Sequence, residues 1–284
     1  MASAHGIARR AKSATKHTAQ HPALELLERA GYIVRGVLDA AMGTFALGLA
    51  AGLGGTATDQ SGSLVILSGG PAGRAILLAV ILGLGAYALW GFVRAIFDPL
   101  HRGKDASGIA DRLGFVWSGI AYGSVVLFAL HLFIGSAPGP THDGTQDTIA
   151  KVLALPAGQA VVIAIGVVAV GVGLGQFVEA YRAAFRKDLK RTEMKKAERR
   201  IVDTLGRLGM VSRGVIFTLI GWFIIQGGFA HDPSKVHGYG GAFLFLLFQP
   251  FGRVLLALVA LGFIALGLHS FACARWIRLL GSER

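Results

Sequence analysis

The sequence is short of cysteine and of charge. Cys273 is its only cysteine, which excludes an internal disulfide bond and any metal cluster built from several cysteines. Charged residues make up 15% of the 284 residues, whereas an average soluble domain has about 25%. Hydrophobic residues make up 53%, and the mean hydropathy is +0.58. A soluble protein of this composition would have too few polar side chains to cover its surface.

The sequence also lacks the short motifs that accompany common catalytic and nucleotide-binding sites. It has no phosphate-binding loop, no G-x-S-x-G, no H-E-x-x-H and no dinucleotide-binding fingerprint between a strand and a helix. Glycine-rich phrases such as GLGAYALWG at 83–91 lie inside apolar runs and carry no phosphate-binding meaning. We therefore expect a non-enzymatic protein with no catalytic residues, no cofactor and no resident metal.

What the sequence does contain is a set of long apolar runs. Each is close to 20 residues, the length at which a helix spans the hydrocarbon core of a bilayer. The six runs are 33–53, 74–96, 114–136, 157–179, 211–230 and 252–274. The sequence therefore predicts an all-α polytopic membrane protein with six transmembrane helices.

The net charge of +12 is distributed unevenly between the two sides of the predicted membrane. Lys and Arg number 21 in 1–30, 97–113, 182–207 and 275–284, against only Lys151 and Lys235 on the other side. This bias follows the positive-inside rule, so we expect both termini in the cytoplasm and anionic lipid headgroups as partners there. Membrane orientation accounts for the positive charge, and we expect no nucleic-acid partner. Residues 1–26 are polar and basic, which predicts a solvated tail without a secretory signal.

Three short phrases recur along the chain and indicate an internal repeat. GYIVRG at 31–36 returns as GMVSRG at 209–214 and, in weaker form, as GFVWSG at 114–119. With these phrases aligned, a proline and a glycine two residues later recur about 40 residues downstream, and a phenylalanine follows 21 residues after each proline. The signature residues expected to pack are Gly31, Gly36, Pro71, Gly73, Gly114, Gly119, Pro156, Gly158, Gly209, Gly214, Pro250 and Gly252.

Each repeat consists of two spans joined by an outer connector, so all three repeats have the same orientation. We expect three same-orientation helical hairpins about a pseudo-three-fold axis normal to the membrane. Each repeated proline is expected in the first turn of its second helix. The predicted division begins with a basic cytoplasmic tail at 1–26. The three repeats follow at 27–98 (repeat 1), 99–186 (repeat 2) and 205–278 (repeat 3), with a charged cytoplasmic connector at 187–204 and a cytoplasmic tail at 279–284.

Glycines at helical spacing inside the spans predict close contacts between helices. Gly36 and Gly43 are seven residues apart, as are Gly214 and Gly221, which places each pair on one helix face. In two further pairs, Gly119 with Gly123 and Gly171 with Gly175, the glycines are four residues apart, and the same packing is expected of them.

The threefold recurrence of these phrases resembles the bacterial membrane family called domain of unknown function 1206, over about residues 27–278. The resemblance implies six spans and the bacterial plasma (inner) membrane, and it implies no activity. The sequence departs from the pattern at Asp39, where the aligned residues of the other repeats are the aromatic Tyr122 and Phe217.

Charged residues within the spans form a candidate intramembrane polar site. They are Arg35, Asp39, Arg94, Glu179 and Arg213. Asp39 lies one helical turn from Arg35, and such neighbours can pair. Three roles stay open for Asp39: a local pair that braces the first helix, a proton- or cation-linked site, and a contact between helices. Arg213 has no acid within a turn, which makes Glu179 a candidate partner.

Other polar residues are expected to have structural roles. His131, Gln176, Gln226 and His269 are expected to hydrogen-bond within the bundle, with proton relay as the alternative. Asp59, His142 and His237 occupy equivalent positions of the three repeats, in the outer connectors. We expect them to be solvated loop residues, with a shared metal site as the less favoured alternative. The stretch KDLKRTEMKKAERR at 187–200 is expected to continue the fourth helix and to lie against anionic lipid.

Two functions follow from these observations. The favoured one is a non-enzymatic membrane module that organises lipid or partner proteins, whose identity the sequence does not give. The alternative is a small transporter or permeation protein with a polar site in the cytoplasmic half of the bundle. An intramembrane enzyme ranks third because no catalytic pair is present.

Overall fold

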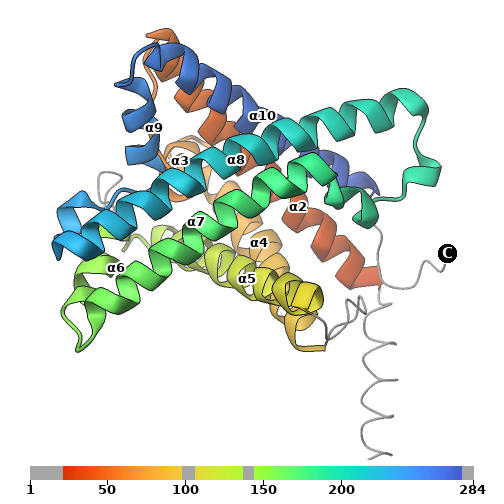
Figure 1. Cartoon of the computed structure of the whole chain (residues 1–284). Helices are drawn as coiled ribbons and strands as arrows, with labels where there is room; N and C mark the ends of the chain where they lie inside the picture. The colour runs from red at the N-terminus through yellow and green to blue at the C-terminus, as the bar shows by residue number, and fades with distance from the viewer. Residues whose placement is uncertain (1–21, 98–105, 137–143, 277–284) are drawn as a thin grey trace, which may run out of the picture.

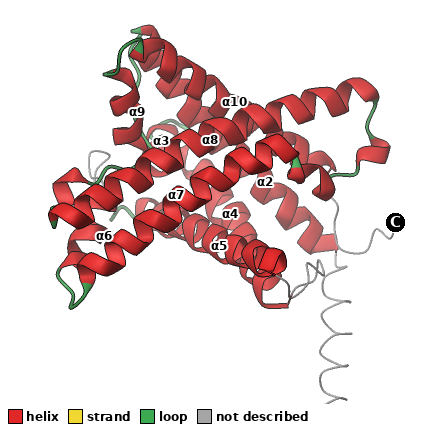
Figure 2. Cartoon of the chain, in the orientation of Figure 1, coloured by secondary structure: helices red, strands yellow, loops and turns green. Residues whose placement is uncertain are grey.

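The computed structural model describes residues 22–97, 106–136 and 144–276, and these residues form helices and turns without a β-strand (Figure 2). The six long helices are α2 (Pro22–Ala51), α4 (Gly73–Phe97), α5 (Ala106–Phe133), α7 (Gly158–Arg182), α8 (Lys196–Ala230) and α10 (Gly252–Trp276). Each contains a stretch long and apolar enough to cross a bilayer. The chain is therefore a multi-pass membrane protein, and the prediction of an all-α fold with six transmembrane helices is confirmed.

Three short helices lie at the same end of the bundle (Figure 1). They are α3 (Gln60–Ser68), α6 (Gly144–Leu153) and α9 (Tyr239–Leu247), each between the two long helices of its repeat. The start of α2, the end of α10 and the α7–α8 connection lie at the opposite end (Figure 1). We call these ends the short-helix side and the connector side.

The closest helix packing lies between repeats. The second long helix of each repeat packs against the first long helix of the next, in the pairs α4–α5, α7–α8 and α10–α2. The α10–α2 pair closes the arrangement, because it joins the last repeat to the first. Within repeats, α2 packs against α4 and α8 against α10, whereas α5 and α7 do not form a closely packed pair in the described chain. The pseudo-three-fold axis itself stays a prediction.

The repeat signature explains this packing between repeats. A Cβ added to Gly36 would stand 2.7 Å from the ring of Phe271, and one at Gly214 would stand 3.1 Å from the ring of Phe177. Gly119 meets Phe92 in the same way, at 3.0 Å. The second glycine of each phrase therefore lies against the signature phenylalanine of the preceding repeat, because a hydrogen side chain leaves room for the ring.

The signature proline and glycine form the turn between each short helix and the following long one. α4, α7 and α10 begin at Gly73, Gly158 and Gly252, two residues after the prolines. The expectation that the prolines lie in the first helical turn is therefore wrong: Pro71, Pro156 and Pro250 lie in the preceding turn. A Cβ at each glycine would collide with the carbonyl oxygens of Ser68, Val152 and Leu247, respectively, so a side chain is excluded.

The other glycines divide into packed and open positions. Gly43 and Gly221 approach neighbouring backbones, with an added Cβ 2.7 Å from the Ala260 carbonyl and 2.6 Å from the Val170 nitrogen. The packing predicted for the glycines that are seven residues apart is therefore correct. Apart from its own helix, nothing lies within 4 Å of a Cβ at Gly114, Gly123, Gly171 or Gly175, so the packing predicted for these four glycines is wrong.

The charged connector is folded against the bundle and does not extend the fourth helix. α7 ends at Arg182, because Ala183 adopts a left-handed conformation with φ of 48°. Two 3-10 turns follow, η1 (Ala184–Asp188) and η2 (Arg191–Glu193), before α8 begins. Phe185, Leu189 and Met194 are buried in a small core under these turns. The predicted helical extension is therefore wrong.

Candidate functional site: a buried polar network

The centre of the candidate site is an ion pair on α2. The Arg35 Nε and an Asp39 carboxylate oxygen are 3.5 Å apart, one helical turn from each other along the chain. The Asp39 side chain is 1% exposed and that of Arg35 is 13% exposed. A charged pair at this depth is costly to bury unless further hydrogen bonds satisfy it. The local pair predicted from the sequence is present.

Two residues from other elements complete the surroundings of the pair. Gln60, the first residue of α3, donates from Nε2 to Asp39 Oδ1 over 2.7 Å. Tyr87 on α4 accepts a hydrogen bond of 3.4 Å from Arg35 Nη1. The Asp39 carboxylate thus joins α2 to a short helix, and the guanidinium joins α2 to α4. The same carboxylate therefore both braces one helix and contacts another element.

A second arginine enters the network from repeat 3. Arg213 on α8 donates from Nη2 to the hydroxyl of Tyr122 on α5 over 3.1 Å. The ring of Tyr122 faces the other arginine, with its centroid 5.5 Å from the Arg35 guanidinium carbon. Arg213 also lies 5.8 Å from the ring of Phe217. Tyr122 therefore lies between two cations, one at its hydroxyl and one at its ring, an arrangement that cation–π attraction favours.

Aromatic rings form the wall of the network. Tyr87 packs edge-on against Tyr32 and Tyr122, with centroids 5.2 and 5.3 Å away, and Tyr239 of α9 packs against Phe217 at 5.9 Å. Burial raises the pKa of the Tyr239 phenol above its ordinary value, so the group stays protonated. These rings limit the access of water and strengthen the electrostatic interactions inside.

The structure brings together three of the five charged residues predicted for the site. Arg35, Asp39 and Arg213 share the network, whereas Arg94 lies two helical turns beyond Tyr87 and stacks near Trp90 and Phe115, with its guanidinium carbon 5.5 and 5.6 Å from their ring centroids. Among ion pairs between described residues, none joins Glu179 to Arg213, so the suggested pairing is replaced by the Tyr122 hydrogen bond.

Sequence reasoning missed the residues that satisfy the charges. Tyr122 is noted in the sequence only as the residue aligned with Asp39. Its contacts in the structure are with Arg35 and Arg213, which precede the aligned positions of repeats 1 and 3 by four residues. Gln60 and Tyr87 gave no signal, because one lies beside a loop and the other among apolar residues.

Most of the other polar residues have local partners. The ring of His269 on α10 contacts the Val202 carbonyl of α8 at 3.2 Å, and His131 bonds the carbonyl of Leu127 in its own helix at 2.8 Å. Asp59 caps α3 by accepting from the Gly62 nitrogen at 2.7 Å. His142, one of the three residues of the suggested outer ring, lies outside the described residues.

A basic pocket lies on the connector side. It is lined by six basic side chains, one carboxylate and one hydroxyl: Arg186, Arg191, Lys196, Arg199, Arg200, Asp203, Thr204 and Arg207. Its volume is about 370 Å³. Asp203 of α8 pairs with two of these arginines, at 2.8 Å from Arg186 and 2.6 Å from Arg191, and so holds the connector on the helix. The other four basic side chains leave the pocket strongly positive.

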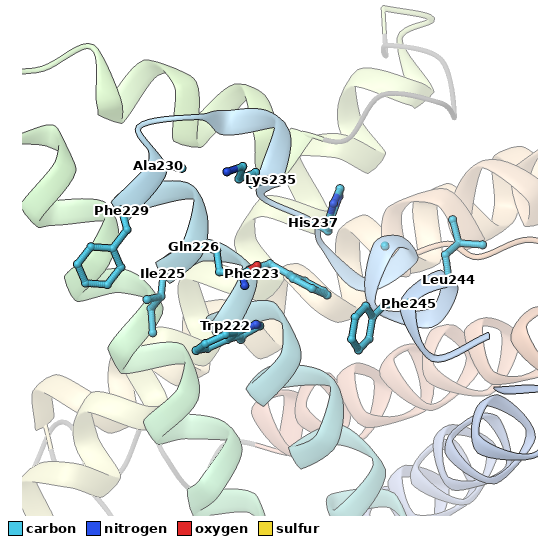
Figure 3. A pocket seen from close by; sticks show the side chains of 11 residues that line it. Trp222, Phe223, Ile225, Gln226, Phe229, Ala230, Lys235, His237, Leu244 and Phe245 are labelled. Atoms are coloured by element: carbon cyan, nitrogen blue, oxygen red, sulfur yellow. The ribbon is translucent and has the colours of Figure 1, made fainter. Parts of the chain in front are cut away.

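An apolar groove lies on the short-helix side, between α8 and α9 (Figure 3). Its volume is about 900 Å³, and aromatic and aliphatic side chains form most of its lining, including Trp222, Phe223 and Phe245. Polar groups lie along one part of it, where Lys235 and His237 follow the end of α8. The Phe223 ring reaches from α8 towards α9 and packs edge-on against Phe245, 5.4 Å between centroids. Half of the Trp222 side chain is exposed.

Comparison with known proteins finds one matching family model and one similar curated protein. The model, described as Domain of Unknown Function (DUF1206), matches residues 30–98, 113–183 and 208–276, one match for each repeat. The uncharacterized protein YxxB of Bacillus subtilis (strain 168) is 34% identical over 249 residues, which cover 88% of this chain and 90% of that protein. No solved structure matches the chain.

Proposed function

The chain belongs to the DUF1206 family, and from that premise we propose that it is a non-enzymatic membrane module that organises anionic lipid. Its place is the bacterial plasma (inner) membrane, with both termini and the connector side in the cytoplasm. The excess of Lys and Arg on the connector side supports this orientation through the positive-inside rule. Protein partners are a further part of the proposal, and no residue set identifies them.

The basic pocket is the observation that carries the proposal. It gathers six basic side chains around one carboxylate. It lies level with the end of α10, where the Lys190 nitrogen donates to the Trp276 carbonyl over 2.7 Å. A transmembrane helix ends at the lipid headgroups, and this level supports the binding of lipid phosphates by the pocket. Each basic residue near an anionic surface contributes about 1 kcal/mol of attraction.

The apolar groove on the opposite side gives independent support. Its lining of Trp222, Phe223 and Phe245 matches the chemistry of an acyl chain, and Lys235 lies where a phosphate would meet it. A helix face that only packs against bulk lipid needs no such hollow. Lipid bound on both sides of the membrane agrees with a module that arranges lipid around itself.

The transport alternative is less favoured because the Asp39 carboxylate is not open to a path. It is fully buried, it pairs with Arg35, and it accepts from Gln60. A carboxylate that binds and releases a proton or a cation has to exchange these partners in each cycle. Unchanged flux of cations into liposomes with Asp39→Asn would remove this alternative, and loss of flux by a folded variant would restore it.

The lipid proposal is tested by measuring bound lipid on the full chain. We would purify the protein in detergent and count bound phosphatidylglycerol and phosphatidylcholine by native mass spectrometry. The variant Arg200→Gln/Arg207→Gln removes two exposed pocket cations that take part in no ion pair between described residues. We expect its affinity for phosphatidylglycerol to fall about 30-fold, at about fivefold for each charge.

The matched control is Arg182→Gln/Lys187→Gln, which removes the same charge from exposed connector residues outside the pocket. The control is expected to keep the wild-type preference for phosphatidylglycerol. Equal binding of the two lipids by the wild-type protein would overturn the proposal. So would equal losses in the pocket variant and the control, because attraction would then depend on net charge alone.

A further inference from the structure

The buried polar network carries an excess positive charge. Arg35 and Arg213 both belong to it. Among the described residues, Asp39 is the one carboxylate that forms an ion pair with either arginine, and it pairs with Arg35. The partners of Arg213 are instead the neutral hydroxyls of Tyr122 and Tyr239. Among the described side chains of the network, two cations and one anion leave one positive charge.

The hydrogen bonds of the network are also incomplete. The Nε atoms of Arg35 and Arg213 are buried and have no hydrogen-bond partner, and the same holds for Asp39 Oδ2, which faces Arg35 Nε. The 3.5 Å contact of Arg35 Nε with the carboxylate is too long for a strong charge-assisted bond, which has a length of about 2.8 Å. A buried guanidinium donor without an acceptor is costly, and almost all such groups in folded proteins are satisfied.

The two arginines converge on one side chain. Tyr122 accepts from Arg213 through its oxygen, and the face of its ring is next to Arg35. Its hydroxyl hydrogen is free of any described acceptor, so the phenol can donate in turn. Three donor groups, two guanidinium groups and one phenol, thus lie together with a single carboxylate. The sign of the net charge favours an anion as the further partner, because a cation would add to the repulsion between the arginines.

We propose that the network binds a small inorganic anion of chloride size, held by Arg213 and Arg35 with the Tyr122 hydroxyl as a further donor. The anion neutralises the second arginine in the way that Asp39 neutralises the first. It also explains why repeat 3 keeps an arginine at the position where repeat 2 has Ser118. This site is separate from the two lipid sites, and it does not rest on the lipid proposal.

The test compares thermal unfolding of the full chain, in nanodiscs, in sodium chloride and in sodium gluconate of equal ionic strength. Gluconate is a much larger anion than chloride and controls for screening. We expect chloride at about 100 times its Kd to raise the unfolding midpoint of the wild-type protein by about 5 °C or more. Binding of radioactive chloride to the same sample gives the Kd directly.

Three variants distinguish the site from a general salt effect. Arg213→Gln removes the second cation and is expected to lose both chloride binding and the shift. Tyr122→Phe keeps the ring and removes one donor, and it is expected to raise the Kd for chloride about tenfold. Arg94→Gln removes an arginine that lies outside the network and is expected to bind chloride as the wild type does.

A wild-type midpoint that is the same in chloride and gluconate, together with no chloride binding, would overturn the proposal. An Arg213→Gln protein that still binds chloride with the wild-type Kd would also overturn it. If Arg213→Gln does not fold, Tyr122→Phe decides: a folded protein with an unchanged Kd contradicts the site. None of these results depends on whether phosphatidylglycerol binds to the connector side.

Discussion

Gly36 on α2 lies directly against the ring of Phe271 on α10, the contact by which the last helix of the chain packs against the first. A Cβ at Gly36 would also stand 2.9 Å from the Gly267 carbonyl, so backbone as well as ring limits the space. Gly119 with Phe92 and Gly214 with Phe177 repeat the relationship. A repeat signature that looks local in the sequence is therefore a contact between neighbouring repeats.

Gly36→Ala is expected to destabilise the protein by about 1–3 kcal/mol, the usual cost of overpacking. The ring can move aside, but the Gly267 carbonyl belongs to a helix backbone and cannot. Unfolding in detergent, followed by tryptophan fluorescence, measures the change. Gly123→Ala is the control, because its added Cβ meets open space, and it is expected to be neutral or to stabilise by up to about 1 kcal/mol. Equal effects of the two substitutions would contradict the packing role.

Gly158→Ala tests the turn that precedes α7. The added Cβ would collide with the Val152 carbonyl, so the end of α6 has to move, and we expect a loss of more than about 1 kcal/mol. Gly171→Ala lies in the same helix at an open position and is expected to leave unfolding unchanged or slightly improved. Comparable melting of both variants would show that the turn tolerates a side chain.

Asp39→Asn removes the carboxylate and leaves Arg35 buried without a counter-ion. We expect a loss of about 3–5 kcal/mol in the free energy of unfolding. The double variant Arg35→Gln/Asp39→Asn removes both charges, and it is expected to recover most of that loss. The two unfolding curves are compared in the same detergent. A double variant as unstable as the single one would mean that the pair matters through its shape and not through its charge.

Asp203→Asn is expected to release the connector, because Asp203 holds both Arg186 and Arg191. The connector is rich in Lys and Arg, so limited trypsin digestion measures its opening, and we expect cleavage near 186–191 at least tenfold faster than in the wild type. Glu193→Gln removes only a long contact of 3.9 Å to Lys190 and is the control, with unchanged cleavage. Equal rates in all three proteins would show that the hydrophobic core below the turns is sufficient.

The proposed orientation is tested by labelling introduced cysteines in intact cells. In a Cys273→Ser background, Leu155→Cys places a thiol on the short-helix side and Lys187→Cys places one on the connector side, both at exposed positions. A maleimide that does not cross membranes is expected to label Leu155→Cys only. Labelling of Lys187→Cys in sealed cells would reverse the orientation.

The sequence predicts the fold in outline because hydrophobic length and repeat spacing are properties of the chain itself. All six spans are found, with α2 and α8 longer than their apolar runs. Errors arise where the outcome depends on neighbours. Gly171 and Gly175 share a helix face as predicted, but spacing alone cannot tell whether another helix covers that face, and here none does.

The same reasoning applies to the connector and to the polar network. The charged stretch after α7 has helix-forming residues, yet a left-handed Ala183 and the pairing of Asp203 with arginines from η1 and η2 fold it back. The Arg35–Asp39 pair is predictable because its members are one turn apart on a single helix. The Arg213–Tyr122 bond joins residues 91 positions apart, and only the arrangement of the repeats brings them together.

The contacts between repeats have a consequence for the order of the chain. α4–α5 and α7–α8 are joined by connectors, whereas α10 and α2 make the equivalent contact without a covalent link. The end of α10 and the start of α2 lie on the same side of the bundle (Figure 1). The termini thus lie at one of three contacts of the same kind between repeats. A circular permutant that begins with repeat 2 or repeat 3, and links α10 to α2, is therefore expected to form the same helix pairs.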